Sequence, residues 1–251
     1  MSTFSYSREA LENLHIEDTT LLDRLVDFES AHKTHAPHIT MVYESGGQDP
    51  ITGDIPWSVG DPFTWRKAAV IQEMAYSFGQ AAGGYVDIAF LGFAQVDMYG
   101  NVNTHHIGKD LINPKVRLTG SGGNNDLSSL TEDMILVGLQ TPERFPEKVD
   151  FITSVGYLEG GDSRKKAGLI GNGPLAVISQ WGIYDFEPVT KRMRVKSLTP
   201  GIPFEIAQQT TGFELLKPEG EIPETPMIPT DILDVLRTEV DPGGVFTAMP
   251  S

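Results

Sequence analysis

The stretch VDIAFLGFAQV at Val86–Val96, followed by the turn residues DMYGN at Asp97–Asn101, decides the fold class of this chain. Its residues are apolar almost throughout, as in a strand of a parallel sheet that is covered on both faces. Just upstream, Thr64–Gln80 places apolar residues on one helical stripe and stops at glycines, which predicts an amphipathic helix leading into this strand. A helix that leads into a buried strand is typical of an α/β layered fold.

Further apolar runs extend the predicted sheet on both sides of this strand. The β-branched and aromatic run Ile39–Tyr43 predicts a buried strand with Glu44 at its carboxyl end. Later strands are predicted at Met134–Leu139, Phe151–Val155 and Leu175–Ile178, with a β-hairpin formed by Ile183–Phe186 and Met193–Leu198. Because a hairpin pairs its strands antiparallel, we predict an open α/β sheet that is mixed, mostly parallel and flanked by helices.

Helices are also predicted near both ends of the chain. One helical face near the N-terminus carries Leu21, Leu22, Leu25 and Phe28. A short helix is predicted to start at Pro203, and Thr230 is predicted to cap a last helix that Pro242 closes. We expect a single domain over residues 1–251, because this length suits one large hydrophobic core.

The composition excludes several classes of protein. No apolar run approaches the roughly 20 residues that cross a bilayer, and the N-terminus lacks the features of a signal peptide, so a cytoplasmic protein is expected. The 34 acidic and 19 basic residues give a net charge of −15, which repels nucleic acid over most of the surface. The chain has no cysteine, so a nucleophile must be an oxygen or a lysine.

Glu44 is the most informative single position. A carboxylate that follows the apolar run Ile39–Tyr43 and precedes small residues can face the crevice where open α/β sheets bind ligands. The same spacing also fits an ordinary surface glutamate at the end of a strand. The residues alone leave both interpretations open.

A glycine-rich loop at Thr119–Asp126 is the second candidate. Its three glycines, Gly120, Gly122 and Gly123, leave backbone N–H groups bare enough to donate to a ligand oxygen, as in an oxyanion site. The loop matches neither the dinucleotide-binding pattern nor the phosphate loop of nucleotide-binding proteins. A plain flexible turn remains the alternative.

The histidines and tryptophans favour structural roles. Adjacent residues on an extended segment point to opposite faces, so His105 and His106 do not predict a metal site. A second group, His32, His35 and His38, lacks a carboxylate at ligand spacing. We expect the three tryptophans to pack or to line a crevice, namely Trp57, Trp65 and Trp181.

Only two dense basic clusters occur in this acidic chain, at Arg164–Lys166 and at Lys191–Arg192. Such clusters are usually solvated surface charge. One of them could contact phosphates.

Three blocks of sequence, in order, resemble the beta subunit of class I coenzyme A transferases, particularly the glutaconate CoA-transferase branch. The blocks are His35–Gly46 with Ser58–Asp61, Gly92–Asn103, and Arg117–Asn124. Weaker likeness continues from Thr211–Phe213 to Asp241–Gly243, so the resemblance spans about residues 35 to 247.

This resemblance implies a role for each candidate. Glu44 matches the family's glutamate, which attacks an acyl-CoA thioester, forms a mixed anhydride, takes the CoA as a glutamyl thioester and passes it to an acceptor carboxylate. The family's G-x-G-G loop approaches the thioester carbonyl, which implies an oxyanion role for Gly122 or Gly123. Asn124 is expected to help orient the acyl group.

The resemblance also implies the partners. Such subunits share their active site with a homologous alpha subunit, and they use a CoA thioester and a carboxylic acid as substrates without a permanently bound cofactor. Residues 1–34 depart from the family pattern, because Asp18–Ala31 contains no glycine and no clear strand. Two alternatives stay open: an acyl-CoA hydrolase or carbon–carbon bond-cleaving enzyme with Glu44 as general base, and a non-catalytic subunit.

Overall fold

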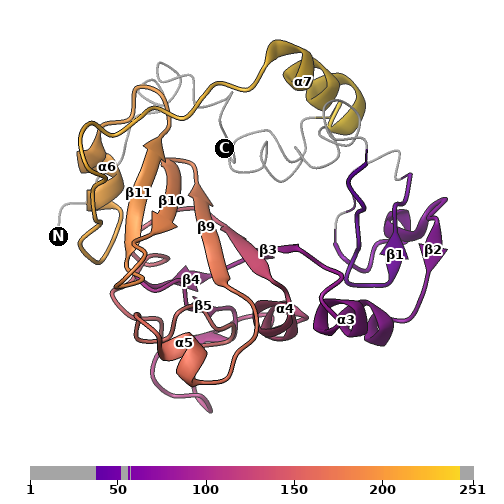
Figure 1. Cartoon of the computed structure of the whole chain (residues 1–251), viewed down its shortest axis with the longest axis horizontal. Helices are drawn as coiled ribbons and strands as arrows, with labels where there is room; N and C mark the ends of the chain where they lie inside the picture. Colours follow the sequence, from indigo (N-terminus) through magenta and orange to yellow (C-terminus); the bar gives the residue numbers. More distant parts are fainter. Residues whose placement is uncertain (1–37, 52–55, 57, 244–251) are drawn as a thin grey trace.

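A five-stranded mixed sheet forms the centre of the computed structural model, which describes residues 38–51, 56 and 58–243 (Figure 1). The strand order is β11-β10-β9-β8-β3. The strands are β3 (Ile88–Gly92), β8 (Asp133–Val137), β9 (Gly173–Ser179), β10 (Gly182–Phe186) and β11 (Met193–Leu198). β3, β8 and β9 run parallel, and β10 and β11 continue the sheet antiparallel. The predicted α/β fold with a mixed sheet and the predicted hairpin are confirmed.

The register of the sheet brings apolar side chains together on one face. Leu91 of β3 pairs with Leu136 of β8, which pairs with Val177 of β9, which pairs with Tyr184 of β10. All four are buried in the main core. Directly opposed residues share a face of a sheet, so these four form one row of the core. Burying each such side chain contributes about 1.5–3 kcal/mol to folding.

β3 is an edge strand whose two faces differ. Its Ala89 and Leu91 are buried, whereas Ile88 and Phe90 are 41% and 40% exposed. The expectation of a strand covered on both faces is therefore wrong for β3. The single run Val86–Val96 also divides, because the chain turns after Gly92 before it forms β4 (Gln95–Val96).

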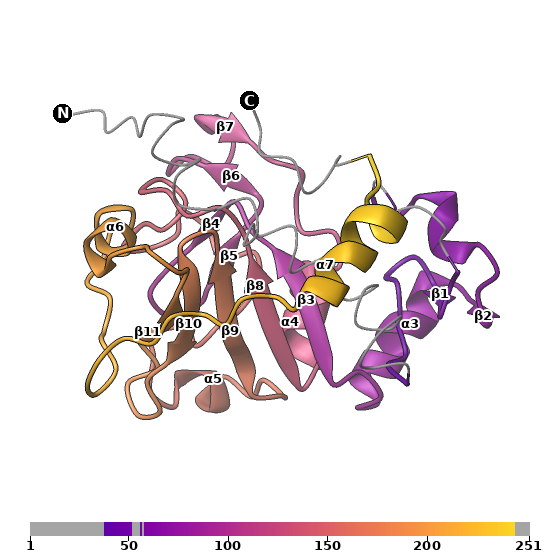
Figure 2. The same ribbon diagram turned by 90° about the horizontal axis from the view of Figure 1, so that it is seen from above.

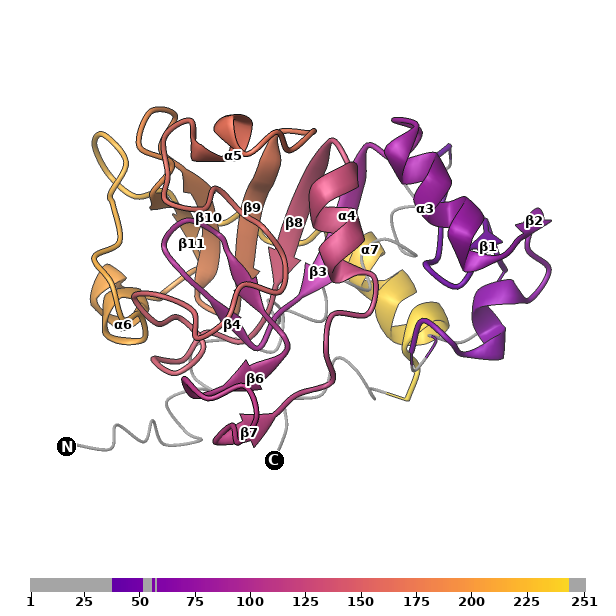
Figure 3. The ribbon, with the colours of Figure 1, turned by 90° about the horizontal axis from the view of Figure 1, so that it is seen from below.

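Helices lie on both faces of the sheet. α4 (Asn124–Leu130) packs against one face, and α7 (Thr230–Val235) lies on the other face near β3 (Figures 2 and 3). A π-helical turn, Leu236–Val240, continues α7, and α6 (Phe204–Gln209) lies at the β11 side. The helices predicted near Pro203 and Thr230 are confirmed, although Pro229 rather than Thr230 occupies the cap position of α7. Among the described helices, none is long and apolar enough to cross a bilayer.

The lobe formed by the first described residues stands beside the β3 edge (Figure 1). It contains β1 (Gly47–Gln48), a 3-10 turn η2 (Pro62–Trp65), β2 (Val70–Ile71) and α3 (Met74–Ala82). The predicted strand Ile39–Tyr43 does not form, since only Val42 makes a single bridge there. The predicted helix Thr64–Gln80 is wrong before Met74, because that stretch first turns and then pairs with β1.

Two short hairpins fold beside the sheet, β4 with β5 (Val102–Asn103) and β6 (His106–Ile107) with β7 (Val116–Arg117). The predicted strand Phe151–Val155 does not form, because this run makes only a bridge between Ser154 and Val102. The short helix α5 (Ser163–Lys166) follows it. The N-terminal helix and segment 1–34, His32, His35 and Trp57 lie outside the described residues.

Candidate active site

Glu44 lies on a tight turn rather than at the end of a strand. The N–H of Gly46 donates to the carbonyl oxygen of Tyr43 at 2.9 Å, and the N–H of Tyr43 donates to that of Gly47 at 2.8 Å. Gly46 has a φ of +108°, and a Cβ there would lie 1.8 Å from the carbonyl oxygen of Gln72. Only glycine meets both demands. The Glu-Ser-Gly sequence therefore fixes the place of Glu44 on the turn.

The 3-10 turn η2 holds this turn from the side. The Ser45 hydroxyl lies 3.1 Å from the Thr64 hydroxyl and accepts the indole N–H of Trp65 at 3.2 Å. The Asp61 carboxylate caps η2 by accepting the N–H of Phe63 at 3.0 Å. Trp65 thus contributes a hydrogen bond that supports the turn, while the residue as a whole is 40% exposed.

The glycine-rich loop brings its backbone to the carboxylate of Glu44. The N–H of Gly123 donates to Oε1 of Glu44 at 3.1 Å. A Cβ at Gly123 would lie 2.7 Å from Cδ of Glu44 and 2.6 Å from the ring of Phe78 on α3. Gly122 is the next neighbour, since a Cβ there would lie 3.8 Å from Oε1 of Glu44. Residues far apart in the sequence thus meet in one site.

Two contacts fix the loop to the rest of the fold. The side-chain amide of Asn124 donates to the carbonyl oxygen of Gly92 at 3.1 Å, and the N–H of Gly120 donates to that of Thr104 at 3.0 Å. Gly92 is the last residue of β3. The site therefore lies near the carboxyl end of a parallel strand, where open α/β sheets bind ligands.

The surroundings of Glu44 favour the protonated form of its carboxyl group, compared with a glutamate that is fully exposed to water. Partial burial raises the pKa of its carboxyl above the ordinary value, the N–H of Gly123 opposes this, and the negative charge of Asp126 on α4 adds to the increase. A carboxylate with a raised pKa is a stronger base and a stronger nucleophile than an exposed one. Both chemical roles considered for Glu44 benefit from this environment.

The structure brings Glu44, Gly122 and Gly123 together and places Asn124 beside them. The contact made by the Asn124 amide is an anchor to β3, and its role toward an acyl group stays a prediction. Sequence reasoning missed Phe78 and Asp126. Phe78 belonged to the apolar stripe of the predicted helix, and Asp126 ended the predicted loop, so no signal distinguished either from ordinary packing or solvated charge.

The remaining candidates lie outside this site. His105 and His106 pack against Phe151, with ring centroids 5.0 and 5.3 Å away, and Trp181 is buried in the main core. In the part of the chain that the structure describes, no group of three or more His, Cys, Asp or Glu side chains is arranged to hold a metal ion.

The sequence and the fold match a known family of enzymes. The coenzyme A transferase family profile matches residues 29–206, and the chain belongs to this family. Within it, the chain is a beta-type subunit of the class I transferases, as its relatives show.

Two relatives cover most of the chain. The B subunit of 3-oxoadipate CoA-transferase from Pseudomonas knackmussii is 38% identical over 82% of this chain and 79% of its own length. The B subunit of glutaconate CoA-transferase from Acidaminococcus fermentans is 34% identical over 90% of this chain and 86% of its own. The crystal structure of glutaconate CoA-transferase from that organism superimposes with a TM-score of 0.84 at 30% identity, covering 95% of this chain and 98% of that one.

A third relative has a different activity. The cholesterol ring-cleaving hydrolase IpdB subunit of Mycobacterium tuberculosis is 31% identical over 61% of this chain and 59% of its own length. The likeness therefore reaches both transferase and hydrolase subunits.

Proposed function

We propose that this subunit transfers coenzyme A between two carboxylic acids, with Glu44 as the covalent nucleophile. The observation that carries the proposal is the 3.1 Å hydrogen bond from the Gly123 N–H to Oε1 of Glu44. This bond fixes one carboxylate oxygen, while Oε2 accepts no hydrogen bond from the described residues. A partly buried carboxylate with one oxygen held and one free suits attack on a carbonyl carbon.

The first half of the reaction charges Glu44 with CoA. A Glu44 oxygen attacks the thioester carbonyl carbon of the acyl-CoA donor, the carbon–sulfur bond breaks, and the CoA thiolate leaves a mixed anhydride behind. The thiolate then attacks the Glu44 side of that anhydride, which releases the donor acid as its carboxylate. The product is a thioester between Glu44 and CoA.

The second half reverses these steps on the acceptor acid. The acceptor carboxylate attacks the Glu44 carbonyl carbon and displaces the CoA thiolate, which forms a second anhydride. The thiolate then attacks the acyl carbonyl, and Glu44 leaves as a free carboxylate. The new acyl-CoA departs, and no water or external cofactor enters the balance.

The Gly123 N–H is placed for the steps in which Glu44 itself is attacked. Each attack on its carbonyl carbon puts negative charge on a Glu44 oxygen, and the N–H already points at Oε1. A preorganised donor of this kind typically contributes about 3–4 kcal/mol to a transition state. A Cβ at Gly122 would make only an ordinary van der Waals contact with Oε1 of Glu44, at 3.8 Å, so there is space next to this oxygen.

A second candidate function is acyl-CoA hydrolysis or carbon–carbon bond cleavage, with Glu44 as general base. It is favoured by the likeness to the IpdB hydrolase subunit and by the raised pKa of Glu44, since a stronger base accepts a proton more readily. In this case water rather than a second carboxylate is the acceptor, and Glu44 never carries CoA.

The partner is proposed to be an alpha subunit that completes the site. Both transferase relatives are B subunits of their enzymes, and this chain has a net charge of −15, which does not favour binding a polyanionic CoA without a further basic surface. The names of these two relatives contain dicarboxylic acids, 3-oxoadipate and glutaconate, so we propose dicarboxylic acids as assay substrates.

The experiment compares the isolated chain, its complex with an alpha subunit, and the same complex carrying Glu44→Gln. The readout is CoA transfer from succinyl-CoA to glutaconate or 3-oxoadipate. We expect little transfer by the isolated chain, transfer by the complex, and a loss of at least about a thousandfold in the variant. Near-normal transfer by Glu44→Gln would contradict the nucleophile, and thioester hydrolysis without transfer by the wild-type complex would favour the second function.

A further inference from the structure

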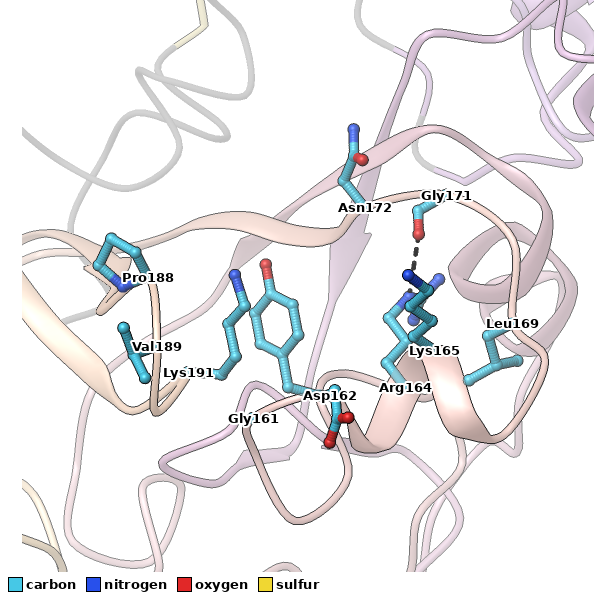
Figure 4. Close-up of a pocket in the computed structure, with 11 residues that line it drawn as sticks. Gly161, Asp162, Arg164, Lys165, Leu169, Gly171, Asn172, Pro188, Val189 and Lys191 are labelled. Atoms are coloured by element: carbon cyan, nitrogen blue, oxygen red, sulfur yellow. Dashed lines mark hydrogen bonds between the residues drawn. The ribbon is translucent and has the colours of Figure 1, made fainter.

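A cavity of about 640 Å³ lies between α5 and the turn that joins β10 to β11 (Figure 4). Its volume is within the usual range of small-molecule sites. The two basic clusters of the sequence, which are some 25 positions apart, converge on it: Arg164 and Lys165 line one side and Lys191 lines the other. This convergence is a property of the fold, since the chain between them forms β9 and β10.

Positive charge dominates the lining. Neither Lys165 nor Lys191 has a carboxylate within ion-pair distance among the described residues. The one carboxylate in the lining, Asp162, forms its ion pair with the exposed Lys166 at 2.9 Å. In a chain with a net charge of −15, a cavity flanked by three cations and one paired carboxylate attracts anions.

Arg164 adds a buried charge that nothing in the described chain neutralises. It is 4% exposed, and its guanidinium donates only to main-chain carbonyl oxygens, such as those of Ser128 and Ile170 at 2.8 Å each. Its donors are thus occupied, and it acts on a ligand through its charge alone. Because burial strengthens electrostatic interactions, this charge favours an anion in the adjacent cavity.

Apolar groups also contribute to the lining, with Leu169 beyond Lys165 and Val189 beyond Lys191 (Figure 4). Tyr157 lines the cavity as well. The Tyr157 ring is fixed, because its hydroxyl donates to the carbonyl oxygen of Pro174 at 2.9 Å. The Lys191 ammonium lies 5.1 Å from the centre of that ring, which orients it along the cavity.

We propose that this cavity binds a small aliphatic dicarboxylate, with one carboxylate at Lys191, the other at Lys165, and the hydrocarbon chain over the Tyr157 ring. Two cationic sides match a molecule charged at both ends, and the Tyr157 ring beside Lys191 offers an apolar surface to its hydrocarbon chain. A compact anion such as phosphate cannot span both sides, and a monocarboxylate engages only one side.

The site is separate from the proposed reaction at Glu44. Gly171 and Asn172, which line the cavity, immediately precede β9, so the cavity lies at the amino ends of the parallel strands. The Glu44 site lies near the carboxyl end of β3. A five-residue strand spans about 16 Å, so one ligand cannot occupy both places.

The test records methyl NMR spectra of this chain, labelled at leucine and valine methyls, in complex with an alpha subunit. The probes are glutarate, butyrate and inorganic phosphate. We expect glutarate to shift the signals of Leu169 and Val189, with a dissociation constant at least tenfold lower than that of butyrate or phosphate. Absence of these shifts with glutarate, or equal affinity for all three probes, would overturn the proposal.

Variants test which side chains are responsible. Lys165→Met with Lys191→Met should weaken glutarate binding at least tenfold, whereas Lys148→Met with Lys196→Met removes the same charge elsewhere and should change it less than twofold. Val189→Glu keeps both lysines and adds a competing carboxylate to the lining, so it should weaken binding as well. Equal losses in the cavity pair and the control pair would show a general charge effect and overturn the site.

Discussion

The proposed role of Glu44 depends on a single ionisable group, and the fold disfavours the charged form of that group. Burial and Asp126 raise its pKa above the ordinary value of 4.5. The unfolded chain therefore gives up this proton more readily than the folded one. The contribution of Glu44 to stability is fully present below pH 4.5 and is lost as the pH rises through the raised pKa.

Glu44→Gln should accordingly stabilise the protein at neutral pH. The amide has no charge to bury, and its oxygen can still accept the Gly123 N–H. We expect the melting temperature of the variant to exceed that of the wild type at pH 7 and the difference to shrink toward pH 4. Glu159→Gln, at an exposed loop position, is the matched control and should show no such trend. A difference that grows toward acid pH would contradict a raised pKa in the folded protein.

Gly122 and Gly123 are neighbours with opposite tolerances for a side chain. Gly123 has an ordinary φ of −85°, but a Cβ would lie 2.7 Å from Cδ of Glu44. Gly122 has a φ of +50°, with room for a Cβ. Gly123→Ala should displace the carboxylate and slow transfer about a hundredfold or more.

The Gly122→Ala variant is the control for this effect. We expect this variant to lose about 1–2 kcal/mol of stability, because the positive φ strains an alanine backbone. Its turnover should fall less than that of Gly123→Ala. Steady-state kinetics and urea unfolding on both variants separate the two effects. Equal kinetic losses in both would mean that the loop acts only as a flexible turn.

At the scale of elements, the turn that carries Glu44 depends on the close packing of β1 and β2. Gly46→Ala would place a methyl group 1.8 Å from the Gln72 carbonyl oxygen, so the strand pair must separate and stability must fall. Gly79→Ala, on α3, meets no atom within 4 Å and should gain about 1 kcal/mol, because alanine favours a helix more than glycine does. Urea unfolding measures both changes, and a Gly46→Ala protein as stable as the wild type would refute this view of the turn.

The elements differ in how far their sequences predicted them. The segments that form β8 and β9 contain continuous apolar runs, and those that form β10 and β11 alternate buried with less buried residues, so local patterns locate all four strands. The prediction of a helix over Thr64–Gln80 is wrong before Met74. The apolar positions fit a helical stripe, but the backbone N–H groups of Ala69 and Gln72 donate to the β1 segment instead. That pairing depends on residues some 20 positions away, which a local pattern cannot show.

The candidate site shows the same limit. Glu44 and the glycine-rich loop could be named from the sequence, but their contact spans 79 positions and rested on family resemblance alone. The proximity of Phe78 and Asp126 to Glu44 depends on tertiary structure, in which α3 packs against α4. Side chains that matter because of their tertiary contacts cannot be recognised from the local sequence pattern.

At the scale of the whole molecule, the two proposed sites lie at opposite ends of the parallel strands of the sheet. The carboxyl end of β3 presents a carboxylate with a backbone donor, and the amino end of β9 presents a cavity flanked by lysines. The net charge of −15 does not favour binding of the polyanionic CoA, so we expect the proposed transfer reaction to use basic groups of a partner subunit.

Trapping the glutamyl thioester tests the central claim most directly. The complex with an alpha subunit is incubated with succinyl-CoA without an acceptor, treated with borohydride or hydroxylamine, digested and analysed by mass spectrometry. We predict a CoA-dependent modification at Glu44, which is reduced to an alcohol or converted to a hydroxamate, and none in the Glu44→Gln complex. An active complex in which Glu44 stays unmodified, or in which another residue carries the CoA, would contradict the account.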